Sequence, residues 1–183
     1  MLLRIASCSL LALSLLILAG CASTSTESSL LADTPPEIER LAVMLDIPDP
    51  EMRQGMLSAF QQALDDQGVE VVLVETSRDP RPERIAAHGA EAEATAVLFA
   101  GTTGMSLRSS SGWTTNTLGT ATYDASTQAF EIQLTLYDVA SQGRAWTATT
   151  TTKKNGNSRR SEIGGAIAAS ALKAMRGDGL LAP

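Results

Sequence analysis

The stretch "ERLAVMLDIPDPEMRQGMLSAFQQALDDQGVEVVLVE", residues 39–75, predicts a strand, a helix and a second strand in that order. The first strand is apolar on both faces of an extended chain, as is typical of a central strand. Asp49 and Pro50 favour the start of the helix, and Gly68 favours its end. Because the crossover is long, the two strands are expected to be parallel and the helix to pack on their sheet.

Two further segments extend this unit. The sequence predicts a short Ala-rich helix within residues 81–94, "RPERIAAHGAEAEA", and a third parallel strand at residues 95–101, "TAVLFAG". The whole series is then β-α-β-α-β. Its second strand, residues 69–75, is rich in β-branched residues and is expected to be apolar on both faces.

After Gly104 the pattern changes to strict alternation. Strands at residues 114–124, 129–138 and 144–153, separated by the breaks "ASTQ" and "VASQG", predict an antiparallel meander. A closing helix is expected within residues 161–179, where Gly and Ala permit a close approach to the sheet. The predicted fold class is therefore α/β of the α+β kind: a mixed sheet, β-α-β-α-β followed by an antiparallel meander and a C-terminal helix.

The first 20 residues have the features of an export signal. Arg4 precedes an apolar stretch of the length of a secretory signal, shorter than the roughly 20 residues that span a membrane. At its end Leu18, Ala19, Gly20 and Cys21 resemble the bacterial lipobox, in which cleavage leaves the cysteine as the first residue. This resemblance implies a diacylglycerol thioether on Cys21 and an amide-linked fatty acid such as palmitate. Several acyl chains together anchor a protein firmly.

Three regions are expected from these features. Residues 1–20 are a cleaved lipoprotein signal peptide, residues 21–36 are the lipidated cysteine and a flexible Ser/Thr/Pro tether, and residues 37–183 are a single mixed α/β periplasmic domain. Ala22 after the cysteine resembles outer-membrane sorting, because Asp there is a familiar inner-membrane retention signal. The expected location is the outer membrane, facing the periplasm; an inner-membrane anchor stays open where sorting rules differ.

The predicted mature body is acidic and has no free thiol. The leader contains one of the 14 basic residues, none of the 20 acidic residues and Cys8, the only cysteine besides Cys21. An acidic body repels nucleic acid, so no nucleic-acid partner is expected. With both cysteines accounted for, no disulfide is expected to stabilise the fold.

The sequence offers little for catalysis, and no enzyme activity is expected. His88 is the only histidine and lacks the partner pattern of a catalytic triad. The glycine loop at residues 100–106, "AGTTGMS", lacks the lysine of a phosphate-binding loop. Adjacent carboxylates such as Asp65 and Asp66 diverge on a helix. Without thiols, and with one imidazole, no metal site is predicted. No cofactor is expected.

Two features are candidate partner-binding sites. The segment "TKKNGNSRR" is the one cationic concentration and places basic residues around a turn before the last helix, where they could contact lipid phosphate, cell-wall carboxylates or an acidic partner. A solvated hairpin is the alternative reading. Trp113 is expected in a polar loop, either as an interface anchor or as a cap on the core. The candidate residues are Trp113, Lys153, Lys154, Arg159 and Arg160.

The order of elements resembles the envelope lipoproteins grouped with CsgG, LpoB and the N-terminal domain of TolB. The resemblance covers about residues 39–176 and is carried by "RLAVMLDI", "GVEVVLVE", "ATAVLFAGTTG" and above all "IQLTLYDVASQGRAWTATT". That last segment resembles the family's run of a strand, a turn with Asp and Gly, and a strand with an aromatic residue near its start; the matching positions here are Asp138, Gly143 and Trp146. Asp138 is expected to close a turn with its side chain and Gly143 to relieve backbone strain.

The resemblance implies a non-enzymatic, protein-binding adaptor or accessory factor in assembly of the cell envelope. Its partners would be the membrane, through Cys21, and another envelope protein; a homo-oligomer is possible. Long insertions that would build a secretion pore are not evident in the sequence. Two alternatives stay open: a subunit of a secretion or export assembly, as CsgG is, and a cell-wall-active enzyme.

Overall fold

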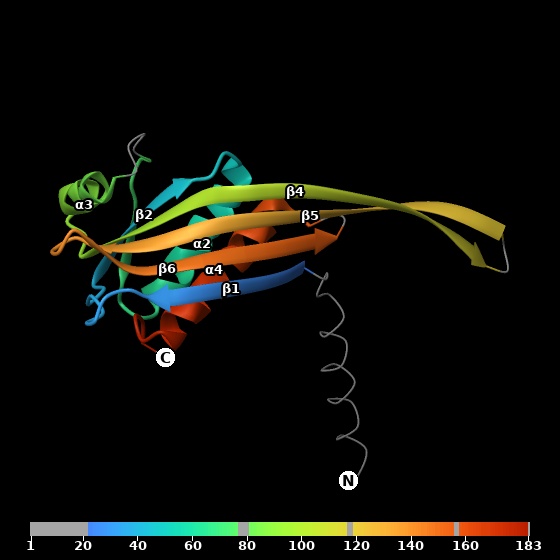
Figure 1. Cartoon of the computed structure of the whole chain (residues 1–183). Coiled ribbons are helices and arrows are strands. Elements are labelled where there is room, and N and C mark those ends of the chain that lie inside the picture. Colours follow the sequence, from blue (N-terminus) through green and yellow to red (C-terminus); the bar gives the residue numbers. More distant parts are fainter. Residues whose placement is uncertain (1–21, 77–80, 117–118, 156–157, 183) are drawn as a thin grey trace, which may run out of the picture.

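A computed structural model of the chain describes residues 22–76, 81–116, 119–155 and 158–182. Within them one six-stranded mixed sheet has the strand order β1-β6-β5-β4-β2-β3 (Figure 1). The strands are β1 (Ala22–Leu30), β2 (Arg40–Asp46), β3 (Glu70–Leu73), β4 (Ala96–Asn116), β5 (Gly119–Asp138) and β6 (Gly143–Asn155). The helices are α2 (Pro50–Asp65), α3 (Pro82–Glu91) and α4 (Arg160–Gly177). The predicted α+β fold class is confirmed.

The parallel half of the sheet follows the prediction. β2 lies between β3 and β4 and is parallel to both, so it is the central strand that its two apolar faces indicated. The carboxylate of Asp49 accepts a hydrogen bond from the backbone N–H of Met52, 3.0 Å away, and Pro50 is the first residue of α2. Gly68, with φ of 73°, turns the chain into β3. Cap and turn residues therefore set both ends of the crossover.

β3 differs from the prediction. It has four residues and lies at the edge of the sheet, and the side chain of Leu73 is 58 % exposed. The strand expected over residues 69–75 is therefore present but shorter, and its two apolar faces do not place it inside the sheet. The composition of a strand does not state its position in the sheet, and an edge strand keeps one open side.

The antiparallel half also departs from the predicted meander. β4 and β5 form one long hairpin whose register runs from Ala96 opposite Asp138 to Asn116 opposite Gly119. The expected break at residues 125–128 is inside β5, and of the strand expected over 114–124, residues 114–116 belong to β4 and residues 119–124 to β5. Residues 119–128, "GTATYDASTQ", contain no proline that would prevent extended pairing. Polar composition alone therefore gave a false break.

The predicted tether is wrong for its first nine residues. Ala22–Leu30 form β1, which pairs antiparallel with β6 along its full length, from Ala22 opposite Lys154 to Leu30 opposite Trp146. Hydroxyl groups hold this pairing: Thr26 Oγ1 lies 2.9 Å from the Thr150 hydroxyl and 2.7 Å from the Ser170 hydroxyl of α4. Alternating threonine and serine, which look like a linker by composition, form a ladder against the threonines of β6. The domain therefore includes β1.

Helices cover the two faces of the sheet unequally. α2 and α4 pack on one face over the main core, in which Trp146 and Phe60 are both 0 % exposed (Figure 1). On the other face α3 covers only one end, over a smaller cluster around Met44, Ile85 and Tyr137. Over the rest of that second face the described residues provide no covering helix. No helix in the described ranges is long and apolar enough to cross a membrane.

Two glycines bring α2 and α4 into direct contact. A Cβ at Gly55 would overlap the carbonyl oxygen of Ser161, and one at Gly164 would overlap the carbonyl oxygen of Met52. The small residues of the last helix therefore serve its contact with α2, where the sequence suggested an approach to the sheet. Backbone-to-backbone contact of this kind leaves no room for a side chain at either position.

Candidate functional site

The most prominent feature outside the core is the outer part of the β4–β5 hairpin. β2 pairs with β4 only as far as Gly101, and β6 pairs with β5 from Thr127 inward. Beyond these points β4 and β5 pair only with each other. We call the paired segments 109–116 and 119–126 the arm. At about 3.3 Å per residue each strand of the arm is about 26 Å long. Figure 1 shows the hairpin projecting beyond the helices.

The arm has two open backbone edges. Strands in a sheet satisfy their N–H and C=O groups on both sides, whereas each arm strand, within the described residues, has a partner on one side only. A two-stranded ribbon without a third strand or a covering helix is only marginally stable in water. Open edges are also templates for pairing with another chain. The geometry of the arm therefore suits contact with a partner.

Trp113 lies in the arm, opposite Thr122. The prediction of a polar loop at this position is wrong, because the residue belongs to β4. The prediction that Trp113 is a partner-binding residue stays a prediction, since its side chain is outside the described part of the structure.

The four predicted basic residues gather at the base of the arm. Lys153 and Lys154 lie near the end of β6, opposite Ser23 and Ala22 of β1. Arg159 is the N-cap of α4. Their local settings differ: Lys153 and Arg159 are exposed, whereas the side chain of Lys154 faces the helices and the residue is 6 % exposed.

Arg160 has a structural role. Its Nε lies 3.5 Å from the carboxylate of Asp49, and its guanidinium lies over the ring of Phe130, 4.9 Å from the centroid. These contacts join the first turn of α4 to that of α2 and to the sheet. Of the predicted cationic cluster, Lys153 and Arg159 therefore present the most accessible charge.

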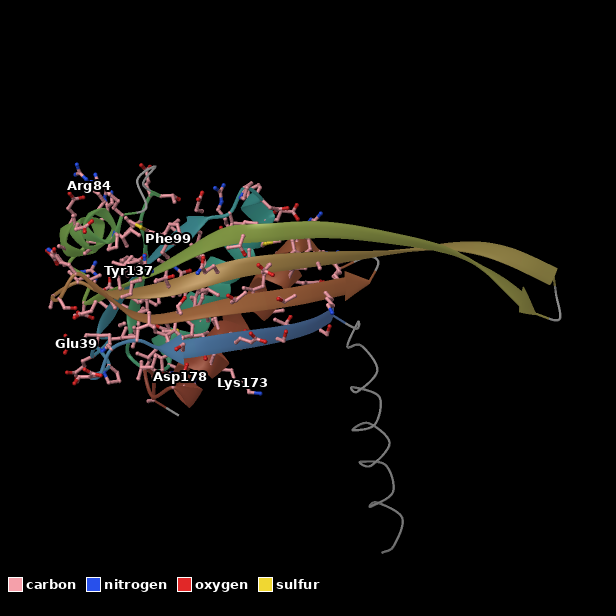
Figure 2. The ribbon with its side chains drawn as sticks, viewed as in Figure 1. Glu39, Arg84, Phe99, Tyr137, Lys173 and Asp178 are labelled. Atoms are coloured by element: carbon pink, nitrogen blue, oxygen red, sulfur yellow. The ribbon has the colours of Figure 1, made fainter. Side chains whose placement is uncertain are left out.

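A polar hollow lies on the open face of the sheet. It has a volume of about 330 Å³, and Arg144, Gln133 and Asp46 contribute to its lining. Phe99 and Tyr137 also line it. Figure 2 labels both side chains on the adjacent strands β4 and β5. A second hollow, of about 600 Å³, lies between α2 and the end of β3. Neither hollow combines a nucleophile with a base in the manner of a catalytic site.

Asp138 closes the β5–β6 turn, as the sequence predicts. Its carboxylate accepts hydrogen bonds from the Ser141 hydroxyl at 2.5 Å and from the backbone N–H groups of Ala140 and Ser141 at 3.1 and 3.2 Å. The bond from the Ser141 hydroxyl, followed by the two backbone N–H groups, lowers the pKa of Asp138 below its ordinary value of 3.8, although partial burial opposes the shift. The strained backbone, with φ of 56°, is at Gln142, so the role expected of Gly143 is wrong.

Trp146, which with Asp138 and Gly143 matches the pattern of the resembled family, is a core residue. Its side chain is fully buried and its Nε1–H donates to Asp178 at 2.7 Å. The hydroxyl of Ser28 donates to the same carboxylate oxygen, also at 2.7 Å. Asp178 therefore joins β6, β1 and the end of α4. The sequence gives no signal for this role of Asp178, because only the pairing of β1 with β6 brings these three residues together.

The remaining predicted residues show no catalytic arrangement. The imidazole of His88 lies 3.4 Å from the carboxylate of Glu91, one turn along the surface of α3. In the described ranges no three His, Cys, Asp or Glu side chains gather as metal ligands would. Leu18, Ala19, Gly20 and Cys21 lie outside the residues that the structure describes.

Comparison with known proteins finds similarity of fold. No family model matches the chain, and neither does any curated protein. A PelC point variant from Paraburkholderia phytofirmans, a dodecamer, shares the fold: the TM-score is 0.50 at 15 % identity, over 82 % of this chain and 96 % of that chain. Unmodified PelC from the same organism gives 0.49 at 15 % identity, over 82 % and 95 %. Lipoprotein GNA1162 from Neisseria meningitidis gives 0.43 at 16 % identity, over 75 % and 98 %. The narrower grouping with CsgG, LpoB and TolB stays a prediction.

Proposed function

We propose that this chain is a lipid-anchored lipoprotein of the bacterial envelope that works by binding another envelope protein and catalyses no reaction. Cys21 carries the anchor, and Ala22 after it favours the outer membrane with the body facing the periplasm. The arm is the contact element. Its projection from the body, with both backbone edges open, is the observation that carries the proposal.

The arm supports binding because it lies outside the main core that the structure describes. That core lies between the sheet and the helices α2 and α4, and its described members on β5 run from Phe130 to Leu136, inward of the arm. Ordered pairing beyond this core costs conformational entropy. A partner strand laid along either edge would supply the missing hydrogen bonds.

A non-catalytic role fits the setting of Asp138. A catalytic site usually brings together groups whose pKa values are perturbed in a cleft. The pKa of Asp138 is lowered, but its partners are those of a turn, and it lies at the end of the sheet away from the arm. Among the described residues, the alternative of a cell-wall-active enzyme has no feature in its favour that compares with the arm.

A second candidate is a subunit of a homo-oligomeric export assembly. It is favoured by the shared fold with the PelC variant, which is a dodecamer. In such an assembly the open edge of one arm would pair with a second copy of this chain, and repetition around a closed ring would leave no edge free. Both candidates use the same element and differ in the identity of the partner.

The test is an arm-shortened variant in which residues 109–126 are replaced by Asn-Gly, a favoured two-residue hairpin turn. Arg108 and Thr127 are opposite each other in the register, so the turn rejoins a paired position. The protein is extracted from native membranes in mild detergent, and the mass of its complex is measured by light scattering. A matched control replaces His88 with Gln on α3.

We expect the full chain and the control to run as a complex and the arm-shortened variant as a monomer with an unchanged melting temperature. A complex that contains only this chain would support the homo-oligomeric assembly. A complex with a second polypeptide would support the adaptor role. A full-length chain that is monomeric in its membrane extract, or an arm-shortened variant that retains its complex, would contradict the proposed role of the arm.

A further inference from the structure

The two outer strands of the body's sheet each have one open edge. Within the described residues β1 pairs only with β6, and β3 pairs only with β2. The large apolar side chains that are exposed in these residues are Leu30 at 38 %, Leu31 at 51 % and Leu73 at 58 %. Leu30 and Leu73 are the last residues of β1 and β3, and Leu31 follows β1. The exposed apolar groups therefore lie where another strand could be added.

Leu30 and Leu73 are the two ends of one row that crosses the whole sheet. Each member of the row is opposite the next in the register, and the row consists of Leu30, Trp146, Leu136, Leu98, Val43 and Leu73. Its four inner members belong to the main core beneath α2 and α4. Side chains of one row lie on one face of a sheet, so both end residues lie on the helix-covered face.

The backbone groups at both ends of this row point outward. The N–H of Val74 donates to a carbonyl of β2, so the N–H of Leu73 is directed away from β2. The N–H of Leu31 donates to a carbonyl of β6, so that of Leu30 is directed away from β6. β1 also runs opposite to β3 across the sheet. Two copies side by side, with their sheets facing the same way, therefore offer an antiparallel pair with Leu30 opposite Leu73.

The edge at β3 also has room for an apolar side chain. The hollow of about 600 Å³ between α2 and the end of β3 is lined by Leu45, Leu57 and Leu73. It lies beside α2, and α2 packs on the helix-covered face. The side chain of Leu30 from a second copy would lie on that same face, next to the hollow. Contact there would remove apolar surface of both copies from water.

One pair of charged groups matches across the same contact. Lys173 of α4 is exposed on the β1 side: the hydroxyl of Ser170, one turn before it, lies 2.7 Å from that of Thr26, and Figure 2 shows Lys173 directed away from the body. Glu75 is exposed directly beyond β3 and lines the hollow. Neither forms an ion pair among the described residues. Arg53 lines the same hollow, so the match concerns these two groups and not whole surfaces.

We infer that copies of this chain associate head to tail on the membrane, with β1 of one copy paired antiparallel to β3 of the next and Leu30 beside Leu73. The inference rests on the proposed anchor at Cys21. β3 has four residues, so the contact is short, and the anchor raises its occupancy by concentrating the chains on one surface. In a dilute detergent extract the contact is expected to be lost.

The joined sheets leave the arms free. Equivalent strands of neighbouring copies are six strand positions apart, about 29 Å at 4.8 Å per strand. Both edges of each arm therefore stay available to another envelope protein, which is the first of the two proposed functions. Joining one row directly to the same row of the next copy also introduces no shift along the strands, which is a condition for a closed ring.

The test is cysteine cross-linking in native membranes. Leu30→Cys and Leu73→Cys are produced in the same cells as separately tagged chains and treated with a short bis-maleimide. Once Cys21 is acylated and the leader is removed, the introduced cysteine is the only thiol of each chain. We expect a dimer with both tags from the mixture and none from either variant alone. Leu30→Cys mixed with Ala140→Cys, an exposed position in the β5–β6 turn, is the matched control and should give none.

The double variant, with both cysteines in one chain, shows whether the contact repeats. Within one chain positions 30 and 73 are five strand spacings apart, about 24 Å, so a short cross-linker cannot join them. We expect a ladder of dimers, trimers and larger species. The arm-shortened variant that carries both cysteines should give the same ladder, because the contact does not use the arm.

The charge pair is tested in the mixture. Lys173→Glu in the chain that carries Leu30→Cys is expected to reduce the dimer several-fold, and Glu75→Lys in the other chain to restore it. Arg159→Glu, an exposed position at the opposite end of α4, should have no effect. A loss that Glu75→Lys does not restore would overturn the assigned role of Lys173.

The remaining outcomes separate this contact from the proposed function. A dimer from Leu30→Cys alone would overturn the head-to-tail arrangement, and equal dimer from the Ala140→Cys mixture would show random collision and overturn the contact. Acyl groups on Cys21, measured by the mass of the mature chain, with no dimer from the mixture would overturn the contact and leave the anchor and the arm unaffected. A mature chain without acyl groups would overturn the anchor and the inference that rests on it.

Discussion

The hydrogen bond from Trp146 to Asp178 should contribute measurably to stability. Replacing Asp178 with Ala removes the acceptor of an indole N–H whose side chain is 0 % exposed. An N–H left without a partner in a buried position costs about 1–3 kcal/mol. For a domain of this size each kcal/mol lowers the melting temperature by about 2–4 °C. We therefore expect Asp178→Ala to melt about 2–12 °C below the unmodified protein.

Two matched variants test whether the lost hydrogen bond from Trp146 causes the drop in stability. Asp178→Asn keeps an oxygen that can accept from the indole, so its stability should fall less than that of Asp178→Ala. Ser28→Ala removes the exposed donor to the same carboxylate and should cost about 0.5 kcal/mol or less. Each is measured by thermal and urea unfolding, with the fluorescence of Trp146 followed in a Trp113→Phe background, because the chain has two tryptophans.

An unchanged melting temperature in Asp178→Ala would show that the indole finds another partner and would refute the reasoning. A loss of stability in Ser28→Ala as large as that in Asp178→Ala would also contradict the reasoning. It would show that Asp178 stabilises the protein by holding β1 and not by accepting from Trp146.

Three further predictions concern the fold. Gly164→Ala should destabilise the protein by about 1–3 kcal/mol or more, because its Cβ overlaps the Met52 carbonyl, while the neighbouring Gly165→Ala should cost far less; urea unfolding decides between them. Ser141→Ala should raise the pKa of Asp138 toward 3.8, measured by carboxyl NMR titration. Since the folded pKa is lowered, the associated stability is present above the unfolded pKa and disappears as pH falls through the folded value, so the variant's deficit should shrink as pH falls below about 4. Removing residues 22–30 should expose the edge of β6 and lower stability, whereas a free tether would have no effect.

The central unit of the fold could be predicted because its signals are local. Apolar residues on both faces of β2, together with the cap at Asp49 and the turn at Gly68, are each decided within a few residues. The same holds for Asp138, whose hydrogen bonds all lie within three residues. Local pattern and final structure agree there.

The other parts of the fold could not be predicted, because they depend on contacts between residues that are far apart in the sequence. The segment 22–30 has the composition of a linker, and only the threonines of β6, more than 100 residues away, make it a strand. The arm was hidden for the same reason, because a run of Ser and Thr indicates a loop as readily as a strand. The candidate site was the part least predictable from the sequence. The arm, the start of β1 and the basic residues at the base of the arm become neighbours only in the folded sheet.

The proposed function depends most directly on the arm as the surface that meets a partner. A photo-crosslinking residue is introduced at position 120 of the arm in living cells, and at position 87 on α3 for comparison. We expect a discrete adduct of defined mass from position 120 and none from position 87. Adducts of equal yield from both positions, or an adduct from α3 alone, would contradict it.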